Sequence, residues 1–276
     1  MRSMYPYSET ARNYIELGKQ KTSTSPARLL ILAIMAGMFI ALAGATANTA
    51  AAAAATPGMA KMLASLVFPT GLIMVVLAGS ELFTGNCLLI IPLMEKEIRI
   101  GPMLYNWGLV YIGNFVGSLI IAFLIVGSLH LGTFENGLAG YTIDIAAAKT
   151  SLGFSDAFLR GIICNILVCI AVWMGYSAKD TTGKVLAMYF PVMAFVLCGM
   201  EHSIANMYFI PAGLIAAMDP VYLAASTADI SSLTWSNFFY ANLLPVTLGN
   251  LVGGIVFVAL PYWFAYVKKA HQKPVE

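Results

Sequence analysis

The segment Gly79-Ser80-Glu81-Leu82-Phe83-Thr84-Gly85-Asn86 lies in the middle of a long apolar stretch and decides how the chain is interpreted. A second polar segment, Gly199-Met200-Glu201-His202-Ser203-Ile204-Ala205-Asn206, interrupts another apolar stretch in the same way. In lipid, unpaired backbone groups and ionisable side chains are tolerated at mid-membrane depth only where they face protein or a water-filled cavity. Paired interruptions, one in each half of a chain, therefore indicate a transport site.

The apolar stretches around these segments have the length and composition of membrane spans. The chain has 276 residues, of which 59% are hydrophobic and 10% charged, whereas about a quarter of an average soluble domain is charged. A net charge of +2 gives no indication of a nucleic-acid partner. Because a span needs about 20 apolar residues, the sequence predicts six spans, near 28–55, 62–94, 101–127, 154–176, 185–217 and 237–267. The whole chain, 1–276, is predicted to be one transmembrane domain.

The distribution of lysine and arginine predicts the orientation of these spans. Short cytoplasmic loops retain positive residues, and most of the basic residues fall in segment 1–26, in the tail 268–276 and in alternate loops. Both of these terminal segments are therefore predicted to lie in the cytoplasm, with the spans in the cell membrane. Residues 5–24 are predicted to form a short interfacial helix. The remaining loops carry acidic residues, namely Glu135, Asp144, Asp219 and Asp229.

The two halves of the chain match each other. An offset of 120 positions places Glu81 on Glu201 and Asn86 on Asn206. Further on, an offset of 136 superposes two Gly-Asn-x-Val-Gly segments that begin at residues 113 and 249. Each half holds three predicted spans, an odd number, so the halves must cross the membrane in opposite directions. The sequence thus predicts an all-α inverted three-helix repeat with broken second and fifth helices.

The polar residues of the repeat have both structural and functional interpretations. The Gly-Asn-x-Val-Gly segments favour close helix packing over pore lining, since small residues let helix backbones approach in lipid. Glu81 and Glu201, with Asn86 and Asn206, are expected to stabilise the breaks, the carboxylates by accepting hydrogen bonds from freed backbone N–H groups. Proton transfer or cation binding by the glutamates is the alternative. His202 is a functional candidate because ionisable residues at membrane depth usually are.

Several of these segments resemble the formate/nitrite transporter family, whose members include formate, nitrite and hydrosulfide channels. The resemblance covers essentially the whole chain and is carried by Glu81–Thr84, Asn106-Trp107, Tyr111–Gly117, Lys149, Asn165 and Glu201–Met207. It implies an aquaporin-like six-helix protomer and a homopentamer with one pore per protomer. Residues 85–87, Gly-Asn-Cys, depart from the hydroxyl-rich pattern of formate channels. Within the family, the chain most resembles the hydrosulfide-channel branch.

The resemblance also implies roles for individual residues. His202 is expected to face Thr84 and Asn165 at the pore centre, and Lys149, in an outer loop, to capture anions at the external mouth. The expected constrictions are an apolar slit and the loop at the first break, formed by Leu72, Phe195, Phe68, Leu82 and Phe83.

The expected function is a channel for small monovalent anions such as hydrosulfide, formate or nitrite. The anion could pass with its hydrogen-bond donors, or cross the apolar slit as a neutral acid, since burying a full charge there is costly. A proton-coupled secondary transporter of the same anions is the main alternative, and an ammonium or urea pore is another. An enzyme is not expected, and neither a cofactor nor a metal site is predicted, because the three histidines are scattered. The four cysteines are expected to be buried.

Overall fold

A computed structural model describes residues 3–268, and this part of the chain is helical and contains no strand, only an isolated bridge between Met4 and Ala178. The helices are α1 (Tyr7–Ser23), α2 (Pro26–Ala52), α3 (Pro57–Val67), α4 (Thr70–Leu77), α5 (Ile90–Met94), α6 (Ile100–Gly127), α7 (Gly137–Thr150), α8 (Phe154–Ser177), α9 (Thr181–Leu197), α10 (Ser203–Ala216), α11 (Pro220–Leu223), α12 (Trp235–Asn237), α13 (Leu244–Gly254) and α14 (Leu260–Tyr266). Short 3₁₀ turns cover Gly85–Leu89 (η1) and His130–Gly132 (η2), and π-helical turns cover Phe238–Leu243 (η3) and Ile255–Ala259 (η4).

Five helical stretches are long and apolar enough to cross a membrane. They are Pro26–Ala52, Pro57–Leu77, Ile100–Gly127, Phe154–Ser177 and Trp235–Tyr266. The predicted span 185–217 corresponds instead to two shorter apolar helices, Thr181–Leu197 and Ser203–Ala216. Large apolar side chains are exposed on the outer faces of the helices, for example Ile112 and Phe123 of α6. A bilayer or a partner subunit is the environment that such a surface requires.

Both predicted breaks are present, and each one begins at a glycine. Gly79 has a φ of +77° and Gly199 a φ of +68°, in the left-handed region that glycine enters at little cost. The N–H of the residue after each glycine bonds back over five residues, from Ser80 to the Val75 carbonyl at 2.8 Å and from Met200 to the Phe195 carbonyl at 3.0 Å. This bond defines the Schellman motif, which ends a helix, so α4 ends at Leu77 and α9 ends at Leu197.

The Gly-Asn-x-Val-Gly segments pack helices closely, as the sequence predicts. In α6, a Cβ on Gly117 would collide with the carbonyl oxygen of Ile34 in α2. In α13, a Cβ on Gly253 would collide with the carbonyl oxygen of Ile162 in α8. Two tightly packed helix pairs, α2 with α6 and α8 with α13, therefore form the frame around the breaks.

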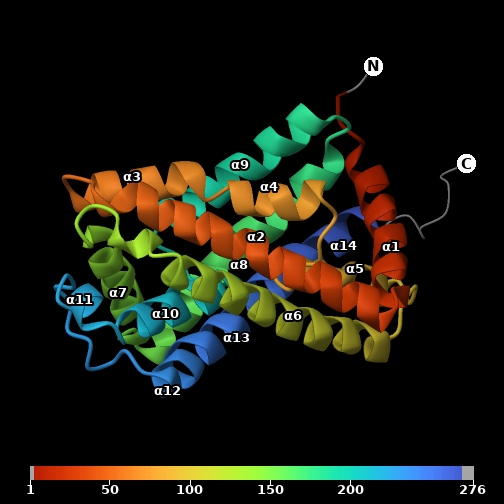
Figure 1. The fold of residues 1–276 in the computed structure, drawn as a ribbon. Helices are drawn as coiled ribbons and strands as arrows, with labels where there is room; N and C mark the ends of the chain where they lie inside the picture. The colour runs from red at the N-terminus through yellow and green to blue at the C-terminus, as the bar shows by residue number, and fades with distance from the viewer. Residues whose placement is uncertain (1–2, 269–276) are drawn as a thin grey trace, which may run out of the picture.

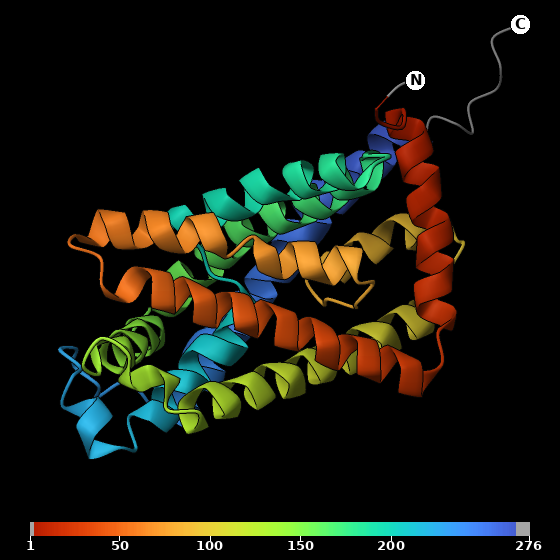
Figure 2. The same ribbon diagram turned by 45° about the horizontal axis from the view of Figure 1, so that its top comes forward.

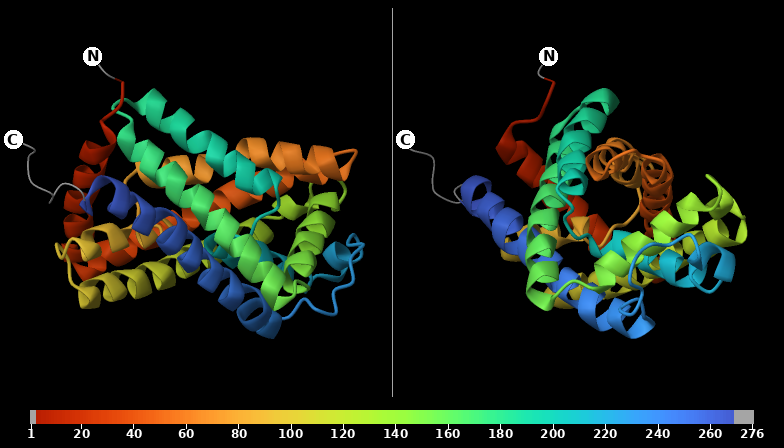
Figure 3. Two further views of the ribbon diagram at one scale, coloured as in Figure 1. Left: turned by 180° about the vertical axis from the view of Figure 1, so that it is seen from behind. Right: turned by 90° about the vertical axis from the view of Figure 1, so that its left-hand side faces the viewer.

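The helices of the frame lie on two sides of the molecule, and α1 lies across one end. α2, α3 and α6 are at the front in Figure 1, whereas α8, α9 and α13 are at the front in the reverse view of Figure 3. α1 runs crosswise to α2 at one end, and α7 and α11 lie at the other end (Figures 1 and 2). The predicted N-terminal helix is thus present. The rings of Tyr7 and Tyr266 are 5.5 Å apart, so both ends of the described chain lie on the α1 side.

Three local features differ from the sequence-based expectations. Residues 56–58, expected to be a connection, begin α3, with the Thr56 hydroxyl accepting from the Met59 N–H. Lys149 lies in the last turn of α7 rather than in a loop. Cys198 is exposed, because it caps the end of α9, whereas the other three cysteines are buried. Of the predicted tail, residues 269–276 lie outside the described chain.

Candidate functional site

Three cavities follow one another between the two ends of the molecule. The first, which we call the α1 cavity, has a volume of about 110 Å³ and is lined by Tyr14, Lys21, Leu72, Glu81, Leu82, Tyr176 and neighbouring residues. The second, the α7 cavity, has about 160 Å³ and is lined by Lys61, Phe68, Lys149, Phe195, Glu201, His202 and neighbouring residues. Between them lies a space of about 10 Å³ that shares Leu72 and Leu82 with the first and Phe68, Phe195 and His202 with the second.

The small space between the two cavities is an apolar constriction. Besides His202, its walls are Ile40, Phe68, Leu72, Leu82, Val168, Val192 and Phe195. The rings of Phe68 and Phe195 meet edge to face at 5.8 Å. A volume of about 10 Å³ holds at most a single water molecule. Four of the five residues predicted to form constrictions, all except Phe83, therefore lie together here.

Phe83 lies elsewhere. Its ring packs on Tyr111 at 4.8 Å and on Trp107 at 6.3 Å, on the side of η1 that faces α6, and it lines none of the three cavities. The predicted constriction role of Phe83 is therefore not supported by its position. Leu82 and Phe83 are neighbours in the break and point to opposite sides of it. Leu82 lines the constriction, and Phe83 packs against α6.

The hydrogen bonds of His202 define its tautomer. Nδ1 accepts from the Ala205 N–H at 3.1 Å, so His202 caps the N-terminus of α10. The proton of the neutral ring then resides on Nε2, which lies 2.9 Å from the Thr84 hydroxyl and donates to it. Asn165 donates to the Thr84 carbonyl at 3.3 Å and to the Asn250 carbonyl at 2.6 Å. The three residues predicted for the pore centre are therefore linked through Thr84.

An ion pair spans the second break at the α7 cavity. Lys149 Nζ lies 2.7 Å from the Glu201 carboxylate, which also accepts from the side-chain amides of Asn206 at 2.6 Å and Asn242 at 3.2 Å. The Asn242 amide donates to the Lys149 carbonyl at 2.9 Å and accepts from Asn206 at 2.7 Å. Lys149 is largely buried in this network, with 17% of its side chain exposed, so its charge is balanced within the protein.

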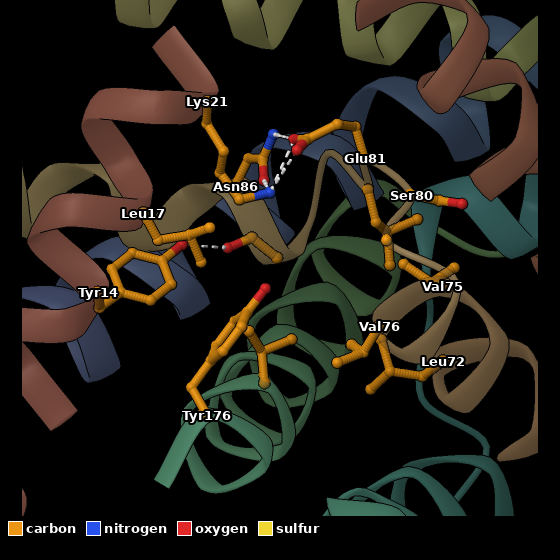
Figure 4. Close-up of a pocket in the computed structure, with 14 residues that line it drawn as sticks. Tyr14, Leu17, Lys21, Leu72, Val75, Val76, Ser80, Glu81, Asn86 and Tyr176 are labelled. Carbon is orange, nitrogen blue, oxygen red and sulfur yellow. Dashed lines mark hydrogen bonds and ion pairs between the residues drawn. The ribbon is translucent and has the colours of Figure 1, made fainter. Parts of the chain in front are cut away.

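A network of the same composition lies at the α1 cavity (Figure 4). Lys21 Nζ is 2.8 Å from both carboxylate oxygens of Glu81 and 3.1 Å from Asn86 Oδ1. Asn86 donates to Glu81 at 2.8 Å and to Asn106 at 2.9 Å, and Asn106 donates to the Lys21 carbonyl at 3.2 Å. Burial opposes the charge on Lys21 and the Glu81 carboxylate favours it, and the balance raises the pKa of Lys21 above its ordinary value.

The sequence did not reveal Lys21 as a site residue, because a lysine in a polar N-terminal segment normally faces solvent. α1 delivers it to the break by packing closely on the inner helices. A Cβ on Gly18 would lie 2.6 Å from the Pro92 side chain, and the buried Tyr14 donates to the Gly85 carbonyl at 3.4 Å. The sequence does contain one signal, which is that Lys21 and Lys149 have matching positions. Each lysine precedes a long apolar helix by only a few residues.

The backbone of each break is held by an asparagine rather than by the glutamate. Asn114 Oδ1 accepts from the Phe83 N–H at 2.9 Å and Asn114 Nδ2 donates to the Glu81 carbonyl at 2.9 Å. Asn250 makes the same pair of bonds, with the Ser203 N–H at 2.9 Å and the Glu201 carbonyl at 3.0 Å. The expectation that the glutamates accept from freed N–H groups thus differs from the structure, since ammonium and amide groups occupy both carboxylates.

Metal binding finds no support in the geometry. Within residues 3–268, no group of three or more His, Cys, Asp or Glu side chains is arranged to hold a metal ion. The candidate functional features of the described chain are the paired charges, the constriction and the polar contacts of His202.

The sequence and the fold are both similar to those of known transport proteins. The profile of the family described as "Formate/nitrite transporter" matches residues 8–264. The "Probable formate transporter" of Methanothermobacter thermautotrophicus is 36% identical over 280 residues, covering 95% of this chain and 97% of the relative. The "Formate channel FocA" of Escherichia coli K12 is 38% identical over 262 residues, covering 92% of each.

Solved structures give the same result. A structure described as "Pentameric formate channel with formate bound" superposes with a TM-score of 0.78 at 36% identity and covers 88% of this chain and 98% of that chain. An "FNT family ion channel" superposes with a TM-score of 0.77 at 28% identity, over 94% of this chain and 98% of that chain.

Proposed function

The chain belongs to the formate/nitrite transporter family, and we propose that it conducts small monovalent anions of the formate and nitrite class through a pathway in each protomer of a homopentamer. The observation that carries this proposal is the line of two cavities, each lined by a Lys–Glu pair, separated by a constriction that holds at most one water molecule. The pentamer rests on the similarity to the "Pentameric formate channel with formate bound". Hydrosulfide is a further candidate, since it has the same charge and a small radius.

The proposed fold is an aquaporin-like protomer with six spans arranged as an inverted three-helix repeat. The two networks support it, because Lys21, Glu81, Asn86 and Asn106 make the contacts that Lys149, Glu201, Asn206 and Asn242 repeat at the other cavity. In this arrangement the second span includes the break after α4, and α9 and α10 together form the fifth. The positive-inside rule places the α1 side, and both termini, in the cytoplasm, so the α7 cavity opens outside.

The paired charges and the constriction would have complementary effects on a weak acid. In each cavity, the Lys–Glu pair offers an anion polar contacts. The apolar walls of the constriction disfavour any charged species, including hydrated cations and chloride. Formate, nitrite and hydrosulfide can escape this penalty by crossing as neutral acids, whereas chloride at neutral pH cannot. We propose that the constriction selects in this way, and that solvent in the cavities supplies and removes the proton.

A proton-coupled secondary transporter is the second candidate, and the dry constriction is the observation that favours it. Crossing as a neutral acid moves one proton with each anion in either case. The two candidates differ in turnover, because a transporter must change conformation in each cycle, on a timescale of microseconds to milliseconds or longer. A flux that saturates at a low turnover number would identify a transporter. A flux far faster than such a conformational cycle allows would identify a channel.

A competitive flux assay tests the proposed function. The purified protein is placed in liposomes, and entry of formate, nitrite, hydrosulfide and chloride is measured at one pH. The first three are expected to enter much faster than chloride. As a control, Leu72→Trp should close the constriction and abolish the flux, whereas Leu66→Trp, at a side chain on α3 that is 41% exposed and lines no cavity, should not. Equal entry of chloride, or an unaffected Leu72→Trp variant, would rule out this pathway.

A further inference from the structure

The charges around the α7 cavity are not balanced. Its charged lining residues are Lys61, Lys149 and Glu201, and Lys149 and Glu201 neutralise each other at 2.7 Å. Lys61 is exposed, and it makes no ion pair or side-chain hydrogen bond with any residue in the range 3–268. The wall of this cavity therefore carries one net positive charge.

The α1 cavity differs in this respect. The charged residues that line it are Lys21 and Glu81, and these are paired at 2.8 Å. Its wall therefore carries no net charge. The two cavities share the same Lys–Glu–Asn network, so the additional lysine on α3 is what distinguishes them.

The ammonium group of Lys61 lies beside the second break. Its Nζ lies 3.4 Å from the position that a Cβ on Gly199 would occupy. Gly199 is glycine because of its positive φ. The charge therefore lies beside the residues that lead from the cavity mouth to Glu201 and His202.

We propose that Lys61, rather than Lys149, supplies the positive potential that captures anions at the outer cavity. A charge that is already paired at 2.7 Å presents little net field to an approaching anion, whereas an unpaired ammonium presents its full field, weakened only by solvent. A unit charge about 7 Å from an anion, at an effective dielectric constant between about 40 and 80, raises the local anion concentration about three- to eightfold. This inference rests on the proposed function, because it assigns the capture of the permeating anion to one residue.

A snorkelling role is the ordinary alternative for an exposed lysine in a membrane protein. Such a lysine extends along apolar surface to reach lipid phosphates. The position of Nζ over Gly199 and within the lining of the α7 cavity favours the pathway over the lipid surface. The two roles predict different results in a bilayer of uncharged lipid, where a contact with anionic lipid cannot contribute.

The electrostatic potential of the cavity can be measured without any transport. Ala64 lines the α7 cavity one helical turn after Lys61, and Cys198 is the exposed cysteine of the described chain. Ala64→Cys in a Cys198→Ser background is modified with anionic and cationic methanethiosulfonate reagents in phosphatidylcholine nanodiscs. Because the reagents differ by two charges, adding Lys61→Gln should lower the ratio of anionic to cationic rates by about tenfold or more at low ionic strength. Lys61→Arg should preserve the ratio.

The capture of the anion is measured in liposomes. Lys61→Gln should raise the half-saturating formate concentration about three- to eightfold at an external ionic strength of about 10 mM, without lowering the maximal flux. The difference should disappear when salt is raised outside but persist when it is raised only inside. Lys184→Gln, which removes a lysine near the opposite end of α9, is the matched control.

The two measurements distinguish this inference from the proposed function. An unchanged reagent ratio in Lys61→Gln, or a half-saturating concentration that shifts equally in Lys184→Gln, would overturn the role of Lys61. A shifted reagent ratio in a protein that carries no formate would instead leave the potential in place and reject the proposed substrate.

Discussion

Removal of Lys149 tests whether the Lys–Glu pairs hold the breaks together. In Lys149→Met, the carboxylate of Glu201 loses a contact of 2.7 Å and stays buried, with 5% of its side chain exposed. Breaking a buried ion pair by removing one partner costs about 3–5 kcal/mol, because an uncompensated charge remains. The amides of Asn206 and Asn242 still donate to Glu201, which places the expected cost near 3 kcal/mol. For a chain of this size, that corresponds to about 6–12 °C in melting temperature.

A second substitution in the same background separates charge from packing. Glu201→Gln removes the charge but keeps an oxygen that can accept from Asn206 and Asn242. The double variant Lys149→Met/Glu201→Gln should therefore recover to within about 1 kcal/mol of the starting protein, because replacing both members of a buried pair is often neutral. Lys21→Met with Glu81→Gln should behave in the same way at the α1 cavity, given the equivalent contacts.

The assay is thermal unfolding of the purified protein in detergent, with the oligomer followed by size-exclusion chromatography. Lys184→Met is the control for loss of a lysine, since no ion pair joins Lys184 to another residue in the range 3–268. A double variant that melts as low as Lys149→Met would show that the loss of stability does not come from an uncompensated charge on Glu201.

Other substitutions test the breaks, the frame and the constriction. His202→Phe removes the cap of α10, so it should lower stability by about 1 kcal/mol in the same melting assay and reduce formate flux at least tenfold. His202→Asn can still cap the helix and should retain the stability. Gly79→Ala should cost about 1–2 kcal/mol through its positive φ alone, because no atom lies within 4 Å of the added methyl group. Gly117→Leu should prevent assembly seen by size exclusion, because its side chain collides with the α2 backbone. Leu72→Ala should widen the constriction and admit larger acids such as acetate and lactate in the flux assay.

The sequence predicted the breaks because their physical signal is local. Gly79 and Gly199 each stand in an apolar stretch beside a glutamate, and such a patch is expensive in lipid unless the helix opens toward polar partners. The Gly-Asn-x-Val-Gly segments were predictable for the same reason, since small residues within a span indicate close packing. Family resemblance then placed four residues in the constriction, but it could not separate Leu82 from Phe83, which point to opposite sides of the same loop.

The charge partners could not be predicted, because they come from segments far apart in the sequence. Lys21 is 60 residues from Glu81, and Lys149 is 52 residues from Glu201. Each lysine has the sequence context of a solvated residue, and only the packing of α1 and α7 against the breaks buries it. For Cys198 the prediction was wrong in the opposite direction. Its apolar neighbours in the sequence predict burial, but it lies at an exposed helix end. Local composition reports the polarity of a segment, whereas burial depends on which segments meet.

The constriction and the hydrogen bonds of His202 together decide in which form an anion can cross. Moving an ion into a low-dielectric protein interior costs several kcal/mol even after relaxation, whereas a carboxylic acid with a pKa near 4 takes up a proton at pH 7 at a cost of about 4 kcal/mol. The anion would cross in its charged form only if hydrogen-bond donors at the constriction offset this cost. The Nε2–H of His202 donates a hydrogen bond to the Thr84 hydroxyl, and Nδ1 accepts one from the Ala205 N–H. A second ring proton, on Nδ1, would therefore break the hydrogen bond that caps α10. The other walls are apolar. An uncommitted donor is therefore missing from the walls of the described constriction, and the neutral acid is the form that this geometry favours.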